Sequence, residues 1–309
     1  MSDMKTKIIT LTLNPAYDVH CEIESFRPFH ENYVKRAQTE AGGKGVNISR
    51  ALTVNNIPNS AFIALGRQNS SAFEGALLKD GIRYSGIFHS GKIRENFVVH
   101  SENMEETRIS FEGIIKDTDL MDQAEYLVLS DCDPDTILVF SGRVPRGIPI
   151  ERVRSFLLAV KETGAKIVVD SNSFSLADYL AVKPWLIKPN QEEVTLFTGR
   201  SVDSIEMAEQ VANDLHSSGI ENVIVSMGMK GLCFANAEGH FSIPGIKLNP
   251  ISTIGAGDSA IAGFLAGIYK GYSTRDAVKL AFAFGTAACL RSGTLPPLPA
   301  NIKEIFDKI

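Results

Sequence analysis

Residues 136–171 read TILVFSGRVPRGIPIERVRSFLLAVKETGAKIVVDS and contain the alternation that decides the fold class. The run TILVFSG (136–142) is continuously apolar, which is typical of a strand buried on both faces. The segment 148–164 has apolar residues at helical spacing and ends in Gly164, a common stop signal. A second apolar run, AKIVVDS (165–171), follows at once. Strand, helix and strand in this order predict a parallel α/β unit.

The same alternation continues on both sides of this unit. Helical patterns cover 44–56, 70–81, 191–199 and 204–219, and apolar strand patterns cover 7–13, 60–66, 185–190 and 221–228. Because the strands are apolar throughout and helices lie between them, we expect a mostly parallel central sheet flanked by helices on both faces. The predicted fold class is α/β.

Two regions, 17–40 and 86–113, break this alternation. Both read as strands and turns with polar residues at alternate positions, and neither has a helical pattern. We expect them to form a small β-sheet that projects over the strand ends as a lid. The alternative is a pair of hairpins without a role in the site.

The composition narrows the class of protein. Of 309 residues, 44% are hydrophobic and 22% are charged, which is enough apolar material for a large core. The net charge of -5 argues against a general binder of nucleic acid or anionic membranes, although it allows a local basic pocket. Four scattered cysteines without a CxxC pair indicate reduced thiols and give no zinc signal. No signal peptide opens the sequence and no run reaches the ~20 apolar residues of a transmembrane helix, so we expect a cytoplasmic protein.

Polar or glycine residues follow several of the expected strands. Open α/β sheets bind ligands beyond the carboxyl ends of their strands, so these residues should meet at one rim. They are Asn14, Gly142 with Arg143, Asp170 to Asn172, Asn190, and Ser226 to Gly228.

The stretch STIGAGDSAIAGFLAGIYKG (252–271) carries the strongest motif. Its glycines let backbone N–H groups approach a ligand, and the N-terminus of the apolar helix that follows attracts anions. Asp258 would repel a phosphate, but it could accept a proton from a hydroxyl that attacks that phosphate. An N-terminal helix cap is an equally good interpretation, because Asp is a common cap.

Two further stretches allow either a ligand site or an ordinary turn. AGGKGVNIS (41–49) places Lys44 in a glycine cluster ahead of a helix, where it could hold a sugar or a phosphate or lie in solvent. KPNQEE (188–193) places Asn190 and Glu193 three residues apart. This pair could order Mg²⁺ with its waters, or it could form a helix cap with an acidic first turn.

The N-terminal turn and the second lid segment are equally ambiguous. TLNPAYD (12–18) offers Asn14 and Asp18 to sugar hydroxyls, or forms an Asx-capped turn without function. Arg94 and Arg108 could contact a phosphate bidentately, or be solvated residues of a charged hairpin.

One motif is misleading. GIFHSGK (86–92) matches the spacing of a P-loop, but Ile93 occupies the Ser/Thr position and a strand pattern follows where the P-loop needs a helix. We reject it. A dinucleotide fingerprint does not open any of the expected helices, so a Rossmann dehydrogenase also loses support.

Several of these motifs together carry a resemblance to a known family. AGGKGVNISRAL (41–52) and STIGAGDSAIAGF (252–264) resemble the two signature regions of the PfkB, or ribokinase-like, sugar kinases. SGRVPRG, KPN with Glu193, and SMGMKG lie between them in the family order, and the resemblance covers essentially the whole chain. TLNPAYD and PWLIKPN resemble the branch that phosphorylates phosphosugars.

The resemblance implies a single ribokinase-like domain over residues 1–309, with ATP and Mg²⁺ as cofactors. It implies that Asp258 is the catalytic base and that the backbone N–H groups of Gly255, Ala256 and Gly257 form the anion hole. The positions matched to nucleotide binding are Lys188, Asn190, Glu193, Ser226, Gly228, Gly231 and Thr253, with Asn190 and Glu193 positioning Mg²⁺ through water. The positions assigned to the sugar phosphate are Asn14, Asp18, Gly43, Lys44, Asn47, Arg94 and Arg143.

The expected reaction is phosphorylation of the C6 hydroxyl of fructose 1-phosphate, with tagatose 6-phosphate or another sugar as the alternative. A regulator that binds a sugar phosphate without catalysis is the alternative from another class. Arg143 stands where the family usually has Ser, and Met229 stands where a small residue is common, so both could alter ligand choice. We expect no nucleic-acid or membrane partner, and a possible homodimer through the exposed strand edges of the lid.

Overall fold

The computed structural model describes residues 6–102 and 104–309 and contains two β-sheets. The strands of the larger sheet are β1 (Lys7–Thr12), β4 (Ser60–Gly66), β5 (Tyr84–His89), β8 (Thr136–Ser141), β9 (Lys166–Asp170), β10 (Leu186–Ile187), β11 (Asn222–Ser226), β12 (Gly231–Asn236) and β13 (Gly239–Pro244). Their order across the sheet is β13-β12-β11-β10-β9-β8-β1-β4-β5. From β11 to β5 every pairing is parallel, and only β12 and β13 are antiparallel additions at one edge. The predicted α/β class is confirmed.

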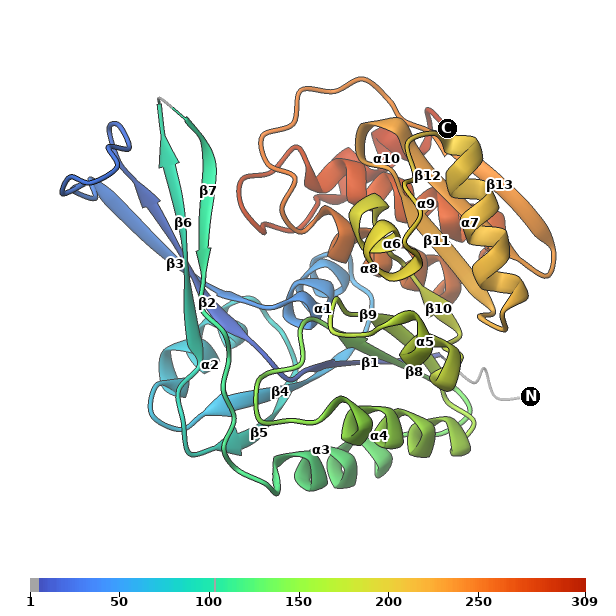
Figure 1. Ribbon diagram of the computed structural model, residues 1–309, viewed down its shortest axis with the longest axis horizontal. Coiled ribbons are helices and arrows are strands. Elements are labelled where there is room, and N and C mark those ends of the chain that lie inside the picture. The colour runs from blue at the N-terminus through green and yellow to red at the C-terminus, as the bar shows by residue number, and fades with distance from the viewer. Residues whose placement is uncertain (1–5, 103) are drawn as a thin grey trace.

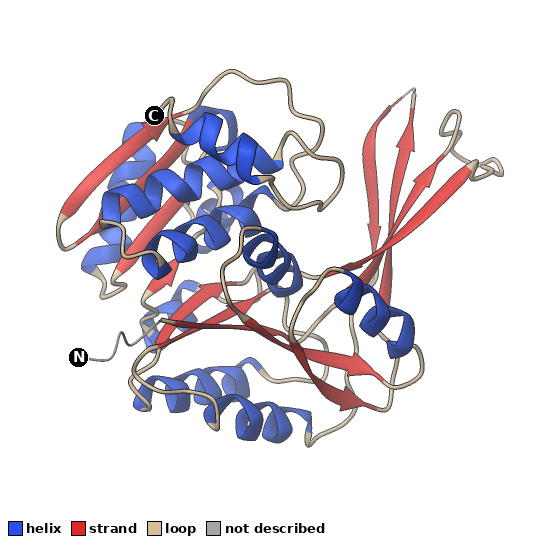
Figure 2. Ribbon diagram, turned by 180° about the vertical axis from the view of Figure 1, so that it is seen from behind, coloured by secondary structure: helices blue, strands red, loops and turns tan. Residues whose placement is uncertain are grey.

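Helices cover both faces of this sheet (Figure 1; Figure 2). They are α1 (Lys44–Val54), α2 (Ser70–Lys79), α3 (Leu120–Leu129), α4 (Ile150–Glu162), α5 (Leu176–Val182), α6 (Gln191–Thr198), α7 (Ile205–Ser217), α8 (Ala256–Tyr269), α9 (Thr274–Ala288) and α10 (Pro299–Phe306), with a short 3₁₀ turn at Gly228–Lys230. Helices α3 to α7 contribute to the core on one face, and α1 and α8 to α10 contribute to the core on the other.

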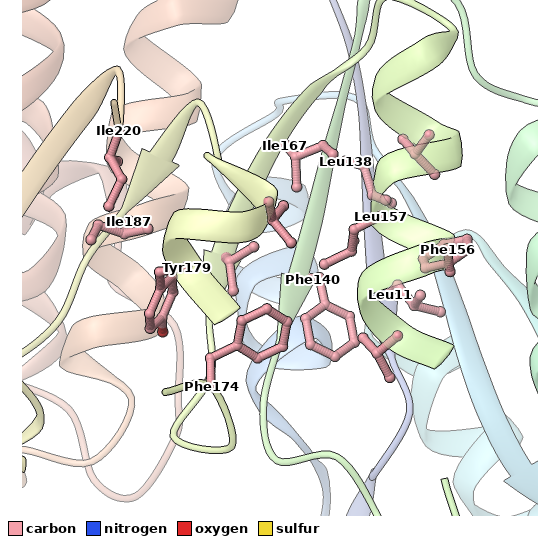
Figure 3. Close-up of a cluster of buried hydrophobic side chains, with 14 of the residues drawn as sticks. Leu11, Leu138, Phe140, Phe156, Leu157, Ile167, Phe174, Tyr179, Ile187 and Ile220 are labelled. Carbon is pink, nitrogen blue, oxygen red and sulfur yellow. The ribbon is translucent and has the colours of Figure 1, made fainter. Parts of the chain in front are cut away.

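Alternate residues of each central strand enter opposite cores, which explains why these strands are apolar throughout. On β1, Ile9 and Leu11 join the core under α3 to α7, while Ile8 joins the core under α8 and α9. Figure 3 shows the first of these cores, where the rings of Phe140 and Phe174 lie 5.9 Å apart between strand and helix. A sheet buried on both faces holds its carboxyl edge rigidly, and that edge carries the polar residues.

The smaller sheet is the lid, formed by β2 (Ala16–Glu22), β3 (Arg36–Gly42), β6 (Arg94–Ser101) and β7 (Met104–Ser110). Its strand order is β3-β2-β6-β7, and it stands away from the main body at the left of Figure 1. The second predicted lid segment, 86–113, begins too early, because Gly86 to His89 belong to β5 and pair with β4 in the main sheet. The rejected P-loop motif spans the end of β5 and the turn after it, and β6, not a helix, follows.

Among the described residues, none of the helices combines the length and apolar character needed to cross a membrane. The four cysteines are free thiols. The first five residues, which belong to the start of the chain where we predict no signal peptide, lie outside the described part.

Candidate active site

Five charged side chains gather where the carboxyl ends of β9 and β10 meet the first turns of α1, α6 and α8. Lys44, the first residue of α1, places its Nζ 3.0 Å from Asp170 Oδ2 and 3.6 Å from Glu193 Oε1. Asp258 and Lys188 are buried beside them and interact with them electrostatically. The predicted rim therefore brings together residues that are as much as 214 positions apart, from 44 to 258.

Asp258 does not cap its helix, which answers the question that the sequence leaves open. The N-cap of α8 is Gly255, whose φ of 75° lies in the left-handed region that favours glycine. Asp258 Oδ2 instead accepts a hydrogen bond of 2.8 Å from Asn47 Nδ2 on α1. Asn47 Oδ1 in turn accepts from Arg50 at 3.2 Å, which fixes the orientation of the amide. The carboxylate is thus held from outside its own helix.

The pKa of the Asp258 carboxyl is raised toward neutral pH. Burial raises its pKa, Lys44 opposes that effect, and the nearby charge of Asp170 adds to it. The hydrogen bond from Asn47 and the charge of Lys188 also oppose it, and the net result is a pKa of about 6. A carboxylate with a pKa close to the working pH is well suited to act as a general base.

The Lys44–Asp170 pair keeps both of its charges. Burial disfavours the charged form of Lys44, but Asp170, Asp258 and Glu193 outweigh it and raise the pKa of the ammonium group. Burial likewise works against an ionised Asp170, but the charges of Lys44 and Lys188 hold the pKa of its carboxyl below the usual value. The site therefore contains a fixed ammonium group beside a carboxylate that can take up a proton.

The start of α8 offers positive charge to an anion. Gly257 lies in the first turn, and a Cβ there would sit only 3.0 Å from Lys188 Nζ, so glycine is what allows the ammonium to come this close. The partial positive charge of the helix N-terminus and the Lys188 ammonium act at the same place. Gly255, Ala256 and Gly257 lie at this end, as the anion-hole interpretation requires.

Asn190 and Glu193 form a capping box at the start of α6. Glu193 N donates to Asn190 Oδ1 at 2.8 Å, and Asn190 N donates to Glu193 Oε2 at 3.0 Å. The cap interpretation of KPNQEE is therefore what the structure contains. Glu193 Oε1 is left facing Lys44, so one carboxylate oxygen still points into the site. Among the described residues, the structure has no group of three or more His, Cys, Asp or Glu side chains arranged to hold a metal ion.

The remaining predicted nucleotide residues lie along the same edge. Ser226 ends β11 and forms a bridge with Asn190. Gly228 opens the 3₁₀ turn, and Thr253 accepts a hydrogen bond from the Ala256 N–H just before α8. Gly231 differs from these, because a Cβ there would collide with the carbonyl of Ile243. Packing within the β12–β13 hairpin therefore explains why this position is a glycine.

The second part of the site lies on the lid and contains arginines around one acid. Asp18 is buried and its Oδ1 accepts from Asn96 Nδ2 at 2.8 Å and contacts Arg108 at 3.3 Å. Arg94 donates to Asn96 Oδ1 at 3.0 Å and to the carbonyl of Asn14 at 3.4 Å. Burial lowers the pKa of the Arg94 guanidinium. The charges of Arg108 and Arg143 lower it further, whereas the charge of Asp18 raises it.

Two residues in this part depend on contacts that the sequence does not show. The sequence leaves Arg108 open between a phosphate contact and a solvated residue, and in the structure it lies 3.3 Å from Asp18. Asn96 carried no motif, and only its position opposite Asp18 on the neighbouring strand reveals it. Arg143, in contrast, is exposed at the end of β8, and Gly43 is the N-cap of α1 with a φ of 121°.

Comparison with known proteins identifies the family. The pattern of the pfkB family carbohydrate kinases matches residues 12–301. The chain belongs to the PfkB family of carbohydrate kinases. It is therefore a phosphotransferase, and ATP is the phosphate donor of this family.

Individual relatives span nearly the whole chain. The 1-phosphofructokinase of Haemophilus influenzae is 32% identical over 98% of this chain and 97% of its own. That of Bacillus subtilis is 32% identical over 91% of both. Among solved structures, phosphofructokinase-2 of Escherichia coli in complex with fructose-6-phosphate has a TM-score of 0.91 and 25% identity, covering 98% of this chain and 99% of that one. The expected ribokinase-like fold is confirmed.

Proposed function

We propose that this PfkB kinase transfers the γ-phosphate of ATP to the C6 hydroxyl of fructose 1-phosphate, giving fructose 1,6-bisphosphate and ADP. The observation that carries the choice of a phosphosugar is the arginine group on the lid side. The charges of Arg108 and Arg143 both act on the Arg94 guanidinium, and Asp18, which pairs with Arg108, opposes them there. This leaves an excess of positive charge for a substrate phosphate. The relatives named 1-phosphofructokinase support the same substrate.

In the proposed reaction, Asp258 removes the proton from the C6 hydroxyl while that oxygen attacks the γ-phosphorus. The new oxygen–phosphorus bond forms as the bond from the γ-phosphorus to the leaving oxygen of ADP breaks. Asn47 holds the carboxylate in place through its 2.8 Å hydrogen bond. The backbone N–H groups of Gly255 to Gly257 and the Lys188 ammonium stabilise the charge on the transferring group.

The oxygen ligands at the site fit a magnesium ion held through water. Glu193 Oε1 points toward Lys44 at the rim, and Asn190 lies next to it at the start of α6. Mg²⁺ keeps several of its own waters and uses few carboxylates, so a full set of protein ligands is not needed. When bound, the ion would neutralise charge on the ATP phosphates.

Initial rates with MgATP on a panel of sugars test the proposal. We expect the highest kcat/KM with fructose 1-phosphate. Tagatose 6-phosphate and fructose 6-phosphate are the alternatives, the second because a similar solved structure holds it. A higher kcat/KM with either would show that this sugar, and not fructose 1-phosphate, is the preferred substrate. If no sugar gives ADP release, the non-catalytic regulator is favoured.

Arg94→Ala should lower kcat/KM for fructose 1-phosphate by about 10- to 100-fold, the scale of a lost charge-assisted hydrogen bond. The kcat/KM for unphosphorylated fructose should stay unchanged, because that sugar offers no anion to the guanidinium. Arg36→Ala is the control, since Arg36 is an exposed arginine of the same sheet with only a 4.0 Å contact to Glu22. Equal losses with both sugars would contradict the phosphate role of Arg94.

We further propose that two copies pair through the lid. Its tip exposes the apolar side chains of Phe29, Tyr33 and Val34, and its edge exposes Ile109 and Phe111. Exposed apolar groups on open strand edges favour association. Analytical ultracentrifugation should give a dimer that Phe29→Glu weakens, and a monomer of the unchanged chain would refute the pairing.

The free thiols support the expected reducing, cytoplasmic location.

A further inference from the structure

Thr294 lies in the segment between α9 and α10 and connects the lid with the main body. Its side chain is buried, and its Oγ1 donates a 3.1 Å hydrogen bond to Glu40 Oε2. Glu40 is on β3 of the lid, directly opposite Asp18 on β2. A residue from near the end of the chain therefore holds the strand pair that carries the sugar-site carboxylate.

The other side of Thr294 faces the turn that precedes α8. A Cβ built on Gly255 would lie 3.6 Å from Thr294 Cα and 3.9 Å from its Cβ and Cγ2, so the two residues are neighbours with room for one methyl group between them. The beginning of the same segment also supports this turn, because the N–H groups of Ile251 and Ser252 donate to the carbonyl of Cys289 at 2.8 and 3.4 Å. Thr294 thus hydrogen-bonds the lid through its side chain and lies next to the N-cap of α8.

A second contact strengthens the connection. A Cβ on Gly293 would lie 2.9 Å from His20 Cε1, so the glycine backbone packs closely against the imidazole of this lid residue. His20 is itself held by His100, with a 3.1 Å contact between ring nitrogens and rings stacked at 5.4 Å and 13°. Glu40 is held in a similar way, since Gln38 donates to its other oxygen at 3.1 Å. The two lid residues that meet this segment, His20 and Glu40, are therefore held in position by neighbours within the lid.

We propose that Thr294 is a positioning residue that couples the position of the lid to the geometry of the phosphate-binding turn. In this role, the Glu40–Thr294 hydrogen bond stabilises the lid in the place where Asp18 meets the sugar. The same residue keeps Gly255, and with it the start of α8, in the position needed for phosphoryl transfer. The inference rests on the proposed function only in assigning sugar binding to the lid.

Thr294→Val tests the coupling, because valine keeps the shape and removes the hydroxyl. We expect kcat/KM for whichever sugar the enzyme phosphorylates to fall about tenfold, the scale of a lost hydrogen bond to a charged group. Thr294→Ser keeps the hydroxyl and should restore most of the sugar activity. Thr163→Val is the matched control, since Thr163 Oγ1 bonds the Val160 carbonyl at the end of α4. Unchanged kcat/KM in Thr294→Val, or a parallel loss in Thr163→Val, would overturn the proposal.

A second measurement does not depend on the substrate. In hydrogen–deuterium exchange of the ligand-free protein, Glu40→Met removes the acceptor of the Thr294 hydroxyl and changes only the lid, yet it should speed exchange in the body segment 251–257. Thr294→Val should have the same effect, and the double variant should exchange no faster than the single variants. Exchange at 251–257 that is unaffected by Glu40→Met, or effects that simply add, would contradict the coupling even if the enzyme proves to use a different sugar.

Discussion

Asp258→Asn is expected to lower kcat by a factor of about 10² or more, with little change in the KM for ATP. The substitution keeps the size of the side chain and an oxygen that can accept from Asn47, so the geometry of the site is retained. What it removes is the ability to take the proton from the attacking hydroxyl. Steady-state kinetics with varied sugar and varied ATP measure this, and near-normal turnover would show that Asp258 is not the base.

The same variant should be more stable than the unchanged protein at pH 8. A carboxyl whose pKa rises from 3.8 to about 6 on folding costs the folded state about 3 kcal/mol once it is ionised. Its stabilising contribution is complete below pH 3.8 and is lost as the pH rises through 6. The gain in melting temperature should therefore be largest above pH 6 and shrink as the pH falls toward 4.

Asp178→Asn is the matched control for both readouts. Asp178 is as buried as Asp258, at 7% exposure, but it forms the capping box of α5 and an ion pair with Arg154. Its substitution should lower stability and leave kcat unchanged. If Asp178→Asn and Asp258→Asn shift the melting temperature in the same direction at pH 8, the electrostatic account of Asp258 is wrong.

Lys44→Met is expected to reduce the free energy of unfolding by about 3 kcal/mol at pH 7, because it leaves Asp170 buried without its main partner. This is the lower end of the range for a broken buried pair, since the Lys44 side chain is 32% exposed. Urea denaturation measures the change. Lys7→Met is the control: Lys7 pairs with Asp131 at 3.3 Å on the surface, where the expected loss is below about 1 kcal/mol.

The pH dependence of Lys44→Met gives a second readout. Lys44 lowers the pKa of Asp258, so its loss should raise that pKa further. For the unchanged enzyme, kcat/KM for the sugar should rise with pH up to about 6, where the base becomes ionised. In Lys44→Met this rise should extend to higher pH. If kcat/KM rises over the same pH range in both proteins, Lys44 does not set the pKa of Asp258.

The sequence predicts the architecture well because burial on both faces leaves a clear pattern. The strands at 60–66 and 136–141 and the helices at 44–54 and 150–162 follow directly from apolar runs and helical spacing. The predicted lid segment includes Gly86 to His89 of β5, because GIFH continues into a stretch with the mixed, alternating composition of half-exposed strands. The true place of β5 depends on pairing with β4, and the sequence of β5 alone does not contain that information.

The candidate site could be predicted only in part, since its side chains meet through contacts between distant segments. Asp258 could not be distinguished from a helix cap without knowing that Asn47, 211 residues earlier, lies next to it. The role of Arg108 depended on which face of the lid it occupies. Glu193 shows the reverse case, because the helix cap is one of the two interpretations that its local sequence allows, while its second contact, with Lys44, is not visible there.

The product of the reaction tests the central claim most directly. The protein should be incubated with MgATP and fructose 1-phosphate, and the mixture followed by phosphorus NMR together with ADP release. We predict a new phosphate ester at C6 that accumulates in equal amount to ADP, with little ADP formed when the sugar is left out. ADP without a new sugar phosphate, or no turnover under these conditions, would contradict the account.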